Sequence, residues 1–324
     1  MRSLNSPEIY RNMGFWNEAT QQAILDTKIG IAGNGGTGNA LGMELARIGV
    51  QDFSIADPEV FDDVNSNRVM GARVDTIGRN KAEVLAEDIL SINPDAKIRV
   101  YRDGIDSDNV DEFIHDRDAV LNGLELKNPE LAVMLWRAAI SRKIGSRSVG
   151  VPVIDVEYIA HAGQGTVFNP NGPLSYEKFL GIKDGDRMPL ADIAALYGEG
   201  GAQISPSRYL AYLPAYGDLD TLKALQEGSP LPSNMIGAGV ASQIGAAEVV
   251  KLARVRVGEK GLRPTYAPNV RWYDAYTNKS GETRHPVFSH YRHLGAVVIS
   301  NLLHRHEEAS YTKEERANRG DLDK

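Results

Sequence analysis

The sequence predicts an α/β fold built on a mostly parallel sheet with helices on both faces. Three observations support this prediction. Short apolar runs alternate with segments of helical periodicity over residues 28–168, which is the pattern of strands joined by crossover helices. The first apolar run leads straight into a glycine-rich turn, and the second ends at an aspartate, Asp57. Folds that bind nucleotides place such residues at the carboxyl ends of parallel strands.

The first half of the chain supplies most of the expected elements, and helix-stopping residues set their ends. Gly49 ends the first crossover helix, and Pro94 follows the second because proline cannot continue a helix. Pro129 opens a later helix, where its missing N–H costs nothing. In chain order we expect strand 29–32, helix 37–48, strand 52–56, helix 79–92, strand 97–101, helix 109–115, strand 119–121, helix 129–142, and strands 151–156 and 165–168.

The second half of the chain changes character. Residues 169–233 are rich in Gly, Pro and Tyr, and we interpret this stretch as an insertion over the sheet edge. Weak helical patterns cover 175–180 and 190–197 within it. Beyond the insertion we expect a long helix over 234–253, a late strand over 268–276 and a helix over 290–304. The late strands are expected to be antiparallel.

The predicted organisation is one core domain with additions. At 324 residues the chain is long enough to bury a sizeable core. The predicted segments are an N-terminal arm (1–27), a Rossmann-like nucleotide-binding core (28–168), an inserted crossover region that binds substrate or forms a lid (169–233), a return helix with late strands that complete the same domain (234–306) and a charged tail (307–324).

Composition narrows the classes of function. With 43 acidic and 36 basic residues the net charge is −7, which argues against a sequence-independent nucleic-acid surface. The chain has no cysteine, so disulfides, thiolate zinc sites and a cysteine nucleophile of its own are excluded. The N-terminus has no apolar run of signal-peptide length, and no long apolar run suggests a membrane span. We therefore expect a cytoplasmic protein that does not enter a membrane.

The glycine-rich turn is the most informative motif. Gly33, Gly35 and Gly38 have the spacing G-x-G-x-x-G, and Gly36 adds a fourth glycine. Such a turn lets the backbone approach a phosphate group, while the N–H groups of the following helix face the anion. The spacing alone fits both a nicotinamide dinucleotide and a nucleoside triphosphate.

Residues after the second strand distinguish these two ligands. The segment contains, in order, Asp57, Glu59, Asn65, Arg68, Gly78 and Lys81. With an acidic pair, an N-x-x-R and a G-x-x-K at these distances, the chain resembles the ThiF/MoeB/HesA type of adenylyltransferase, which is related to ubiquitin-activating enzymes. The resemblance covers roughly residues 10–170 and, more loosely, the end of the late helix. A triphosphate also needs more cations than a dinucleotide, and Arg68 and Lys81 supply them.

The resemblance implies a role for each residue of this set. The turn formed by Gly33, Gly35, Gly36 and Gly38 would hold the phosphates of ATP. The remaining implied contacts are Asp57 and Glu59 with the ribose hydroxyls, Asn65 and Arg68 with the β and γ phosphates, and Lys81 with the α phosphate.

Two further roles follow from the same resemblance. The family places aspartates for magnesium after the fourth strand, where this chain has Asn122 and Glu125. Glu125 still offers the hard oxygen that Mg²⁺ prefers, so we expect it to bind the metal. Arg11 lies in an opening segment like the one whose arginine reaches the γ phosphate of a partner subunit, which implies a homodimer. The family's zinc-binding cysteines are absent, so no zinc is expected.

The predicted activity is ATP-dependent adenylylation of a carboxylate. The substrate would be the C-terminus or a side chain of a peptide or small protein, or a small-molecule acid, and the acceptor cannot be a cysteine of this chain. Two alternatives remain open. The changes at Asn122 and Glu125 also fit a catalytically silent binding subunit. The glycine turn and Asp57 also fit an NAD(P)-dependent oxidoreductase, which would not explain Arg68 and Lys81.

Overall fold

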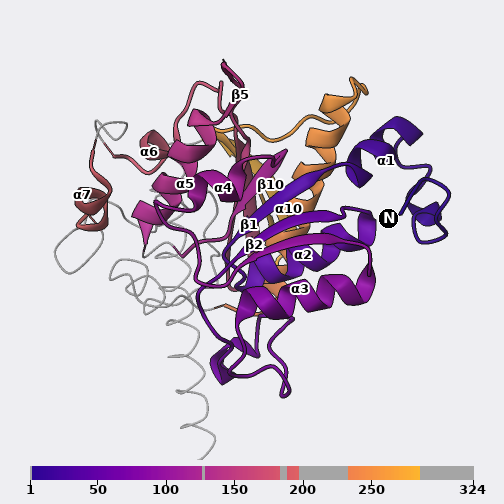
Figure 1. The fold of residues 1–324 in the computed structure, drawn as a ribbon, viewed down its shortest axis with the longest axis horizontal. Coiled ribbons are helices and arrows are strands. Elements are labelled where there is room, and N and C mark those ends of the chain that lie inside the picture. The colour runs from indigo at the N-terminus through magenta and orange to yellow at the C-terminus, as the bar shows by residue number, and fades with distance from the viewer. Residues whose placement is uncertain (1, 126–127, 183–187, 197–232, 285–324) are drawn as a thin grey trace, which may run out of the picture.

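The computed structural model describes residues 2–125, 128–182, 188–196 and 233–284. Its centre is an eight-stranded sheet with the strand order β10-β9-β8-β7-β4-β1-β2-β3. Helices cover both faces, with α2, α3 and α10 on one side and α4 and α5 on the other (Figure 1). Each face has its own apolar core: Phe53 and Leu41 belong to one, Phe113 and Trp136 to the other.

The strands confirm the predicted mixed sheet. The parallel part consists of β1 (Lys28–Ala32), β2 (Asp52–Ala56), β3 (Lys97–Tyr101), β4 (Ala119–Asn122) and β7 (Val153–Ile159). The antiparallel part adds β8 (Ala162–Phe168), β9 (Asn269–Asp274) and β10 (Lys279–Arg284). A separate small hairpin pairs β5 (Lys143–Ile144) with β6 (Arg147–Ser148).

The helices start and end close to the expected positions. They are η1 (Tyr10–Asn12), α1 (Glu18–Leu25), α2 (Gly36–Ile48), η2 (Asp63–Asn65), α3 (Lys81–Ile92), α4 (Val110–Ile114), α5 (Pro129–Ser141), α6 (Tyr176–Phe179), α7 (Leu190–Ala194) and α10 (Met235–Arg256). Gly49 ends α2 with φ of 118°. The third of these α-helices begins two residues later than predicted because Asn80 caps it, accepting hydrogen bonds from the N–H groups of Ala82 and Glu83.

Two predictions about the strands need correction. The strand expected over 151–156 runs on to Ile159 as β7, because all seven of its residues pair with β8. The polar edge strand β10 was not predicted, because its sequence Lys-Ser-Gly-Glu-Thr-Arg lacks apolar alternation and pairing with β9 alone forms it.

The predicted insertion is described only in part, and the predicted tail is not described. The weak helical patterns at 175–180 and 190–197 correspond to the short helices α6 and α7, whose Tyr176, Phe179 and Ile193 join the core under α5. The rest of the predicted insertion from 197 to 232, the helix over 290–304 and the charged tail lie beyond the part of the chain that the structure describes.

Helix α10 packs directly on the sheet. A Cβ atom added to Gly163 of β8 would lie 2.4 Å from the backbone nitrogen of Ala241, so the helix rests on the backbone of the strand. By length and composition α10 could cross a membrane, and it is the one helix within the described ranges that meets this test. Helix α10 packs against β7, β8 and α2. Its apolar composition is therefore that of a helix in the core of the domain.

Replacing Gly38 tests how closely α2 must approach the glycine turn. A Cβ at Gly38 would lie 2.0 Å from the carbonyl oxygen of Gly33, a backbone atom that cannot rotate away. We expect Gly38→Ala to lower the free energy of unfolding, measured by urea denaturation, by about 1–3 kcal/mol.

The matched control is Gly239→Ala in α10, where the nearest atom to a new Cβ is Met235 Cε at 3.9 Å. This variant should be as stable as the parent or up to about 1 kcal/mol more stable, because alanine favours helix more than glycine does. Equal stability of both variants would contradict a tightly packed turn.

Candidate functional site

A cavity of about 250 Å³ lies at the carboxyl ends of β1, β2, β4 and β7. This is where open α/β sheets bind their ligands. Except for Arg11 and Gly38, all the predicted site residues line it: Gly33, Gly35, Gly36, Asp57, Glu59, Asn65, Arg68, Lys81 and Glu125. The structure therefore brings together predicted residues that are up to 92 positions apart, from Gly33 to Glu125.

The glycine turn forms one wall of the cavity. Gly33 has φ of 90°, and a Cβ there would lie 2.2 Å from the carbonyl oxygen of Gly123, so only glycine fits. Space around Gly35 is open, because a Cβ there would meet no atom within 4 Å. Among the described residues, none caps the start of α2 with a side chain. The first N–H groups of this helix therefore suit an anion in the cavity.

Asp57 fastens this turn to the end of β2. Its carboxylate is buried and accepts hydrogen bonds from the backbone N–H of Asn34 at 2.6 Å and of Glu59 at 2.8 Å. Burial raises the pKa of Asp57, although the two N–H donors act in the opposite direction. The carboxylate thus has a structural role in the fold. Each of its oxygens could still accept a further hydrogen bond from a ribose hydroxyl.

Lys81 is a nearly buried cation in the same wall. Its Nζ forms an ion pair with Glu59 Oε2 at 2.5 Å, and the lysine side chain is only 6% exposed. Asn80 sets its position, since the Asn80 amide donates to the carbonyl oxygens of Asp57 and Arg102, each at 3.0 Å. The carboxylate of Glu59 is the partner that compensates the charge of this buried side chain. Glu59 therefore holds the ammonium group at the cavity.

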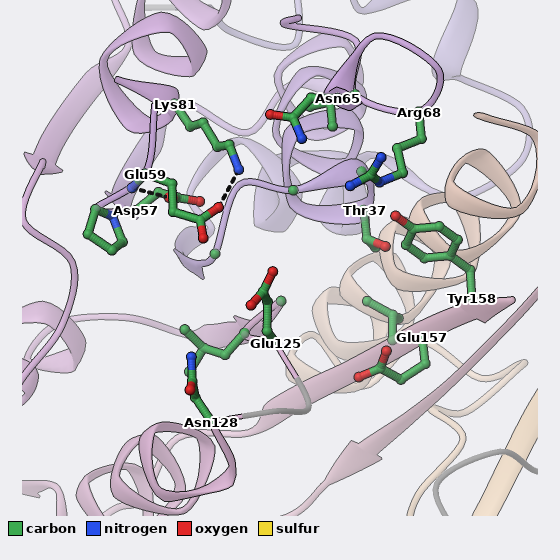
Figure 2. A pocket seen from close by; sticks show the side chains of 18 of the residues that line it. Thr37, Asp57, Glu59, Asn65, Arg68, Lys81, Glu125, Asn128, Glu157 and Tyr158 are labelled. Atoms are coloured by element: carbon green, nitrogen blue, oxygen red, sulfur yellow. Dashed lines mark hydrogen bonds and ion pairs between the residues drawn. The ribbon is translucent and has the colours of Figure 1, made fainter. Parts of the chain in front are cut away.

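Asn65 and Arg68 complete the side of the cavity that can donate hydrogen bonds. Figure 2 shows Asn65 between Lys81 and Arg68, with Glu125, Asn128 and Glu157 across the cavity. The side-chain oxygen of Asn65 accepts from the N–H of Asp62 at 3.1 Å, so its NH₂ group is the end that faces inward. The donor side chains of Asn65, Arg68 and Lys81 thus face the carboxylate of Glu125, while Asp57 and Glu59 lie beside Lys81.

Glu125 lies in an exposed position after β4, on the acidic side. Within the described residues, no group of three or more His, Asp or Glu could hold a metal by itself. Mg²⁺ commonly binds one or two carboxylates together with phosphate oxygens, so the single carboxylate of Glu125 is compatible with a metal that a nucleotide also binds. Asn122 does not reach the cavity lining. Its amide donates to Asp155 Oδ1 at 2.6 Å and to the Tyr176 hydroxyl at 3.0 Å.

Sequence reasoning missed four polar residues that line the cavity: Thr37, Asn128, Glu157 and Tyr158. The last two belong to β7, beyond the point where the strand was predicted to end. Polar residues at the end of a parallel strand were the available signal. Burial raises the pKa of Glu157 well above its ordinary value, and the nearby charge of Asp155 adds to this effect.

Two predicted site residues lie elsewhere. Gly38 supports the turn from behind, by allowing α2 to approach Gly33. Arg11 is exposed on η1 and is not among the residues that line the cavity of its own chain. Its predicted reach into the site of a second copy stays a prediction.

Comparison with known proteins identifies relatives of one kind. The sequence model described as the ThiF family matches residues 9–292. The tRNA threonylcarbamoyladenosine dehydratase of Escherichia coli is 30% identical over 122 residues, which are 37% of this chain and 46% of that protein. The SAMP-activating enzyme E1 of Haloferax volcanii is 26% identical over 153 residues, 47% of this chain and 53% of that protein. The chain thus spans about half the length of these two curated relatives.

Solved structures share the fold over most of the chain. The structure of Escherichia coli MccB with ATP matches with a TM-score of 0.58 and 16% identity, covering 87% of this chain and 74% of that chain. The structure of PaaA has the same TM-score with 14% identity, covering 88% and 76%. At these identities the likeness shows the fold alone.

The buried Asp155 gives a test of the electrostatics beside the cavity. Burial raises the pKa of Asp155 to about 6, above the value of about 3.9 in an unfolded chain. The folded protein therefore binds more protons than the unfolded chain between these values, and stability falls as pH rises through this range. Asp155→Asn should remove this decline and be more stable than the parent at pH 8 by up to about 3 kcal/mol.

Urea denaturation at pH 4, 6 and 8 measures this effect. The difference between Asp155→Asn and the parent should be small at pH 4 and should grow with pH. The control Asp75→Asn changes a side chain that is 75% exposed, so its stability difference should not depend on pH in this way. A pH-independent difference for Asp155→Asn would contradict the assignment.

Proposed function

Because the chain belongs to the ThiF family, we propose that it binds ATP in this cavity and adenylylates a carboxylate. One observation carries the proposal: Lys81, Arg68 and Asn65 stand together beside the uncapped start of α2. The glycine turn alone can hold the two phosphates of a dinucleotide. A triphosphate carries more negative charge, which these additional donors would neutralise.

The proposed reaction is an attack by the substrate carboxylate on the α phosphorus of ATP. A bond forms between a carboxylate oxygen and the α phosphorus, the bond from that phosphorus to the bridging oxygen breaks, and pyrophosphate leaves. The product is an acyl adenylate. A carboxylate is already ionised at neutral pH, so this step requires no general base.

The chain would accelerate this step by positioning and by charge. Lys81 would contact the α phosphate, where negative charge develops, and Arg68 with Asn65 would bind the β and γ phosphates of the leaving group. Asp57 and Glu59 would accept hydrogen bonds from the ribose. Magnesium held by Glu125 would neutralise further phosphate charge.

We propose a peptide or a small protein as the source of the carboxylate, with a small-molecule acid as the alternative. Two names support this class: one relative is named SAMP-activating enzyme E1, and the protein MccB, which shares the fold, has been solved with MccA. The chain has no cysteine. The acceptor of the acyl group therefore cannot be a cysteine of this chain. We further propose a cytoplasmic homodimer in which Arg11 reaches the partner's γ phosphate.

A pyrophosphate-exchange assay with candidate carboxylates tests this function. Exchange supports adenylylation, whereas ATP binding without exchange would indicate a silent binding subunit. Binding of NAD(P) without affinity for ATP would favour the oxidoreductase.

Lys81→Ala tests the phosphate contacts. Charge-assisted hydrogen bonds contribute about 1.5–3 kcal/mol each, so exchange should fall by about 10- to 150-fold while circular dichroism shows an intact fold. The control Arg79→Ala removes a charge two positions away, from a side chain that pairs with Glu87 at 2.5 Å on the surface. The control should retain exchange within about twofold. Parent-like exchange in Lys81→Ala would refute the assignment.

Glu125→Gln tests the metal site by a binding measurement. The parent should bind ATP more tightly with Mg²⁺ than with a chelator, and Glu125→Gln should lose most of this difference because an amide is a weaker magnesium ligand. The control Glu130→Gln makes the same change in the first turn of α5, outside the cavity lining, and should bind like the parent. If Glu125→Gln kept the full effect of Mg²⁺, Glu125 would not be a ligand.

A further inference from the structure

Tyr158 occupies a corner of the cavity that the proposed contacts leave unused. It comes near the end of β7, and its hydroxyl oxygen would lie 2.6 Å from a Cβ added to Gly36. The phenol therefore lies directly over the first residue of α2, beside the helix start where phosphate is proposed to bind. Only a glycine at position 36 leaves room for it.

The Tyr158 hydroxyl also lies next to the Arg68 side chain. Figure 2 shows its oxygen directed toward the Arg68 guanidinium, and the charge of Arg68 counteracts the rise in the Tyr158 pKa that burial causes. A guanidinium can only donate, so in a hydrogen bond with Arg68 the tyrosine oxygen would accept and its own hydrogen would stay available for another acceptor. This hydrogen can point to Ser233 or into the cavity.

Arg68 is held from its other side as well. Its Nη1 donates to the carbonyl oxygen of Val64 at 2.7 Å and to Asn67 Oδ1 at 3.0 Å. Asn67 in turn binds the start of α10, since its Nδ2 donates to the Ser233 carbonyl at 2.8 Å and its own carbonyl accepts from the Met235 N–H at 2.9 Å. Hydrogen bonds to Val64 and Asn67 therefore hold the Arg68 side chain, and Asn67 links it to the start of α10.

We infer that Tyr158 is a positioning and specificity-determining residue for the terminal phosphates of the nucleotide. It orients Arg68 over the start of α2 and offers its own O–H to a terminal phosphoryl oxygen. The pair thereby selects a nucleoside triphosphate over a monophosphate. This inference rests on the proposed function, because it assumes that ATP occupies the cavity.

Tyr158→Phe keeps the ring and removes only the hydroxyl. We expect calorimetric titration of the full chain with ATP and Mg²⁺ to show about tenfold weaker binding, the effect of one hydrogen bond to a charged group. AMP binding should stay within about twofold. A tyrosine that only filled space would change both affinities equally, so the ratio of ATP to AMP affinity is the decisive readout.

A second variant tests whether the tyrosine acts through the arginine. In an Arg68→Gln background, adding Tyr158→Phe should weaken ATP binding clearly less than it does in the parent, because coupled residues are not additive. The control Tyr101→Phe removes a hydroxyl that bonds Glu112 at 3.2 Å, outside the cavity lining, and should change neither affinity.

The outcomes separate this inference from the proposed function. If the parent binds ATP but Tyr158→Phe keeps the parental ratio of ATP to AMP affinity, the inference alone is overturned. Full additivity with Arg68→Gln would also overturn it. A parent protein that binds no nucleoside triphosphate would remove the proposed function and this inference together.

Discussion

The buried carboxylate of Asp57 is the constraint on which the site depends. It accepts the N–H of Asn34 in the glycine turn and the N–H of Glu59 in the next crossover. The backbone carbonyl of the same residue accepts from Asn80, the cap of the helix that begins with Lys81. One residue therefore sets the distance between the phosphate-binding turn and the buried lysine, before any ligand is considered.

The cavity contains both cations and carboxylates, a combination that suits a nucleotide with its metal. Lys81, Arg68 and the start of α2 supply positive charge and N–H donors, Asp57 and Glu59 lie beside Lys81, and Glu125 lies across the cavity. An anionic polyphosphate would meet the donors, and a divalent cation would meet Glu125. Because these groups are held by caps, ion pairs and backbone hydrogen bonds, they need little rearrangement to stabilise charge during a reaction.

Much of the fold could be predicted from the sequence. Its parallel strands are short apolar runs, and single residues mark helix ends, as Gly49 does for the end of α2 and Pro129 for the start of α5. Motif spacing also placed Asp57, Asn65, Arg68 and Lys81 in one region, and the structure gathers them around one cavity.

The remaining features depend on tertiary contacts that have no local signal. The edge strand β10 forms only by pairing with β9, and β7 extends past its apolar run because β8 pairs with it. Glu157 and Tyr158 were therefore not recognised as cavity residues. The partner of Lys81 was also not predicted, because no local signal in the sequence pairs the lysine with Glu59 as the structure does.

The most direct test of the proposed ATP site is a crystal structure with a non-hydrolysable ATP analogue. We predict density for three phosphates at the start of α2, within contact of Lys81 and Arg68. A phosphate chain directed away from these side chains, or an empty cavity, would contradict it.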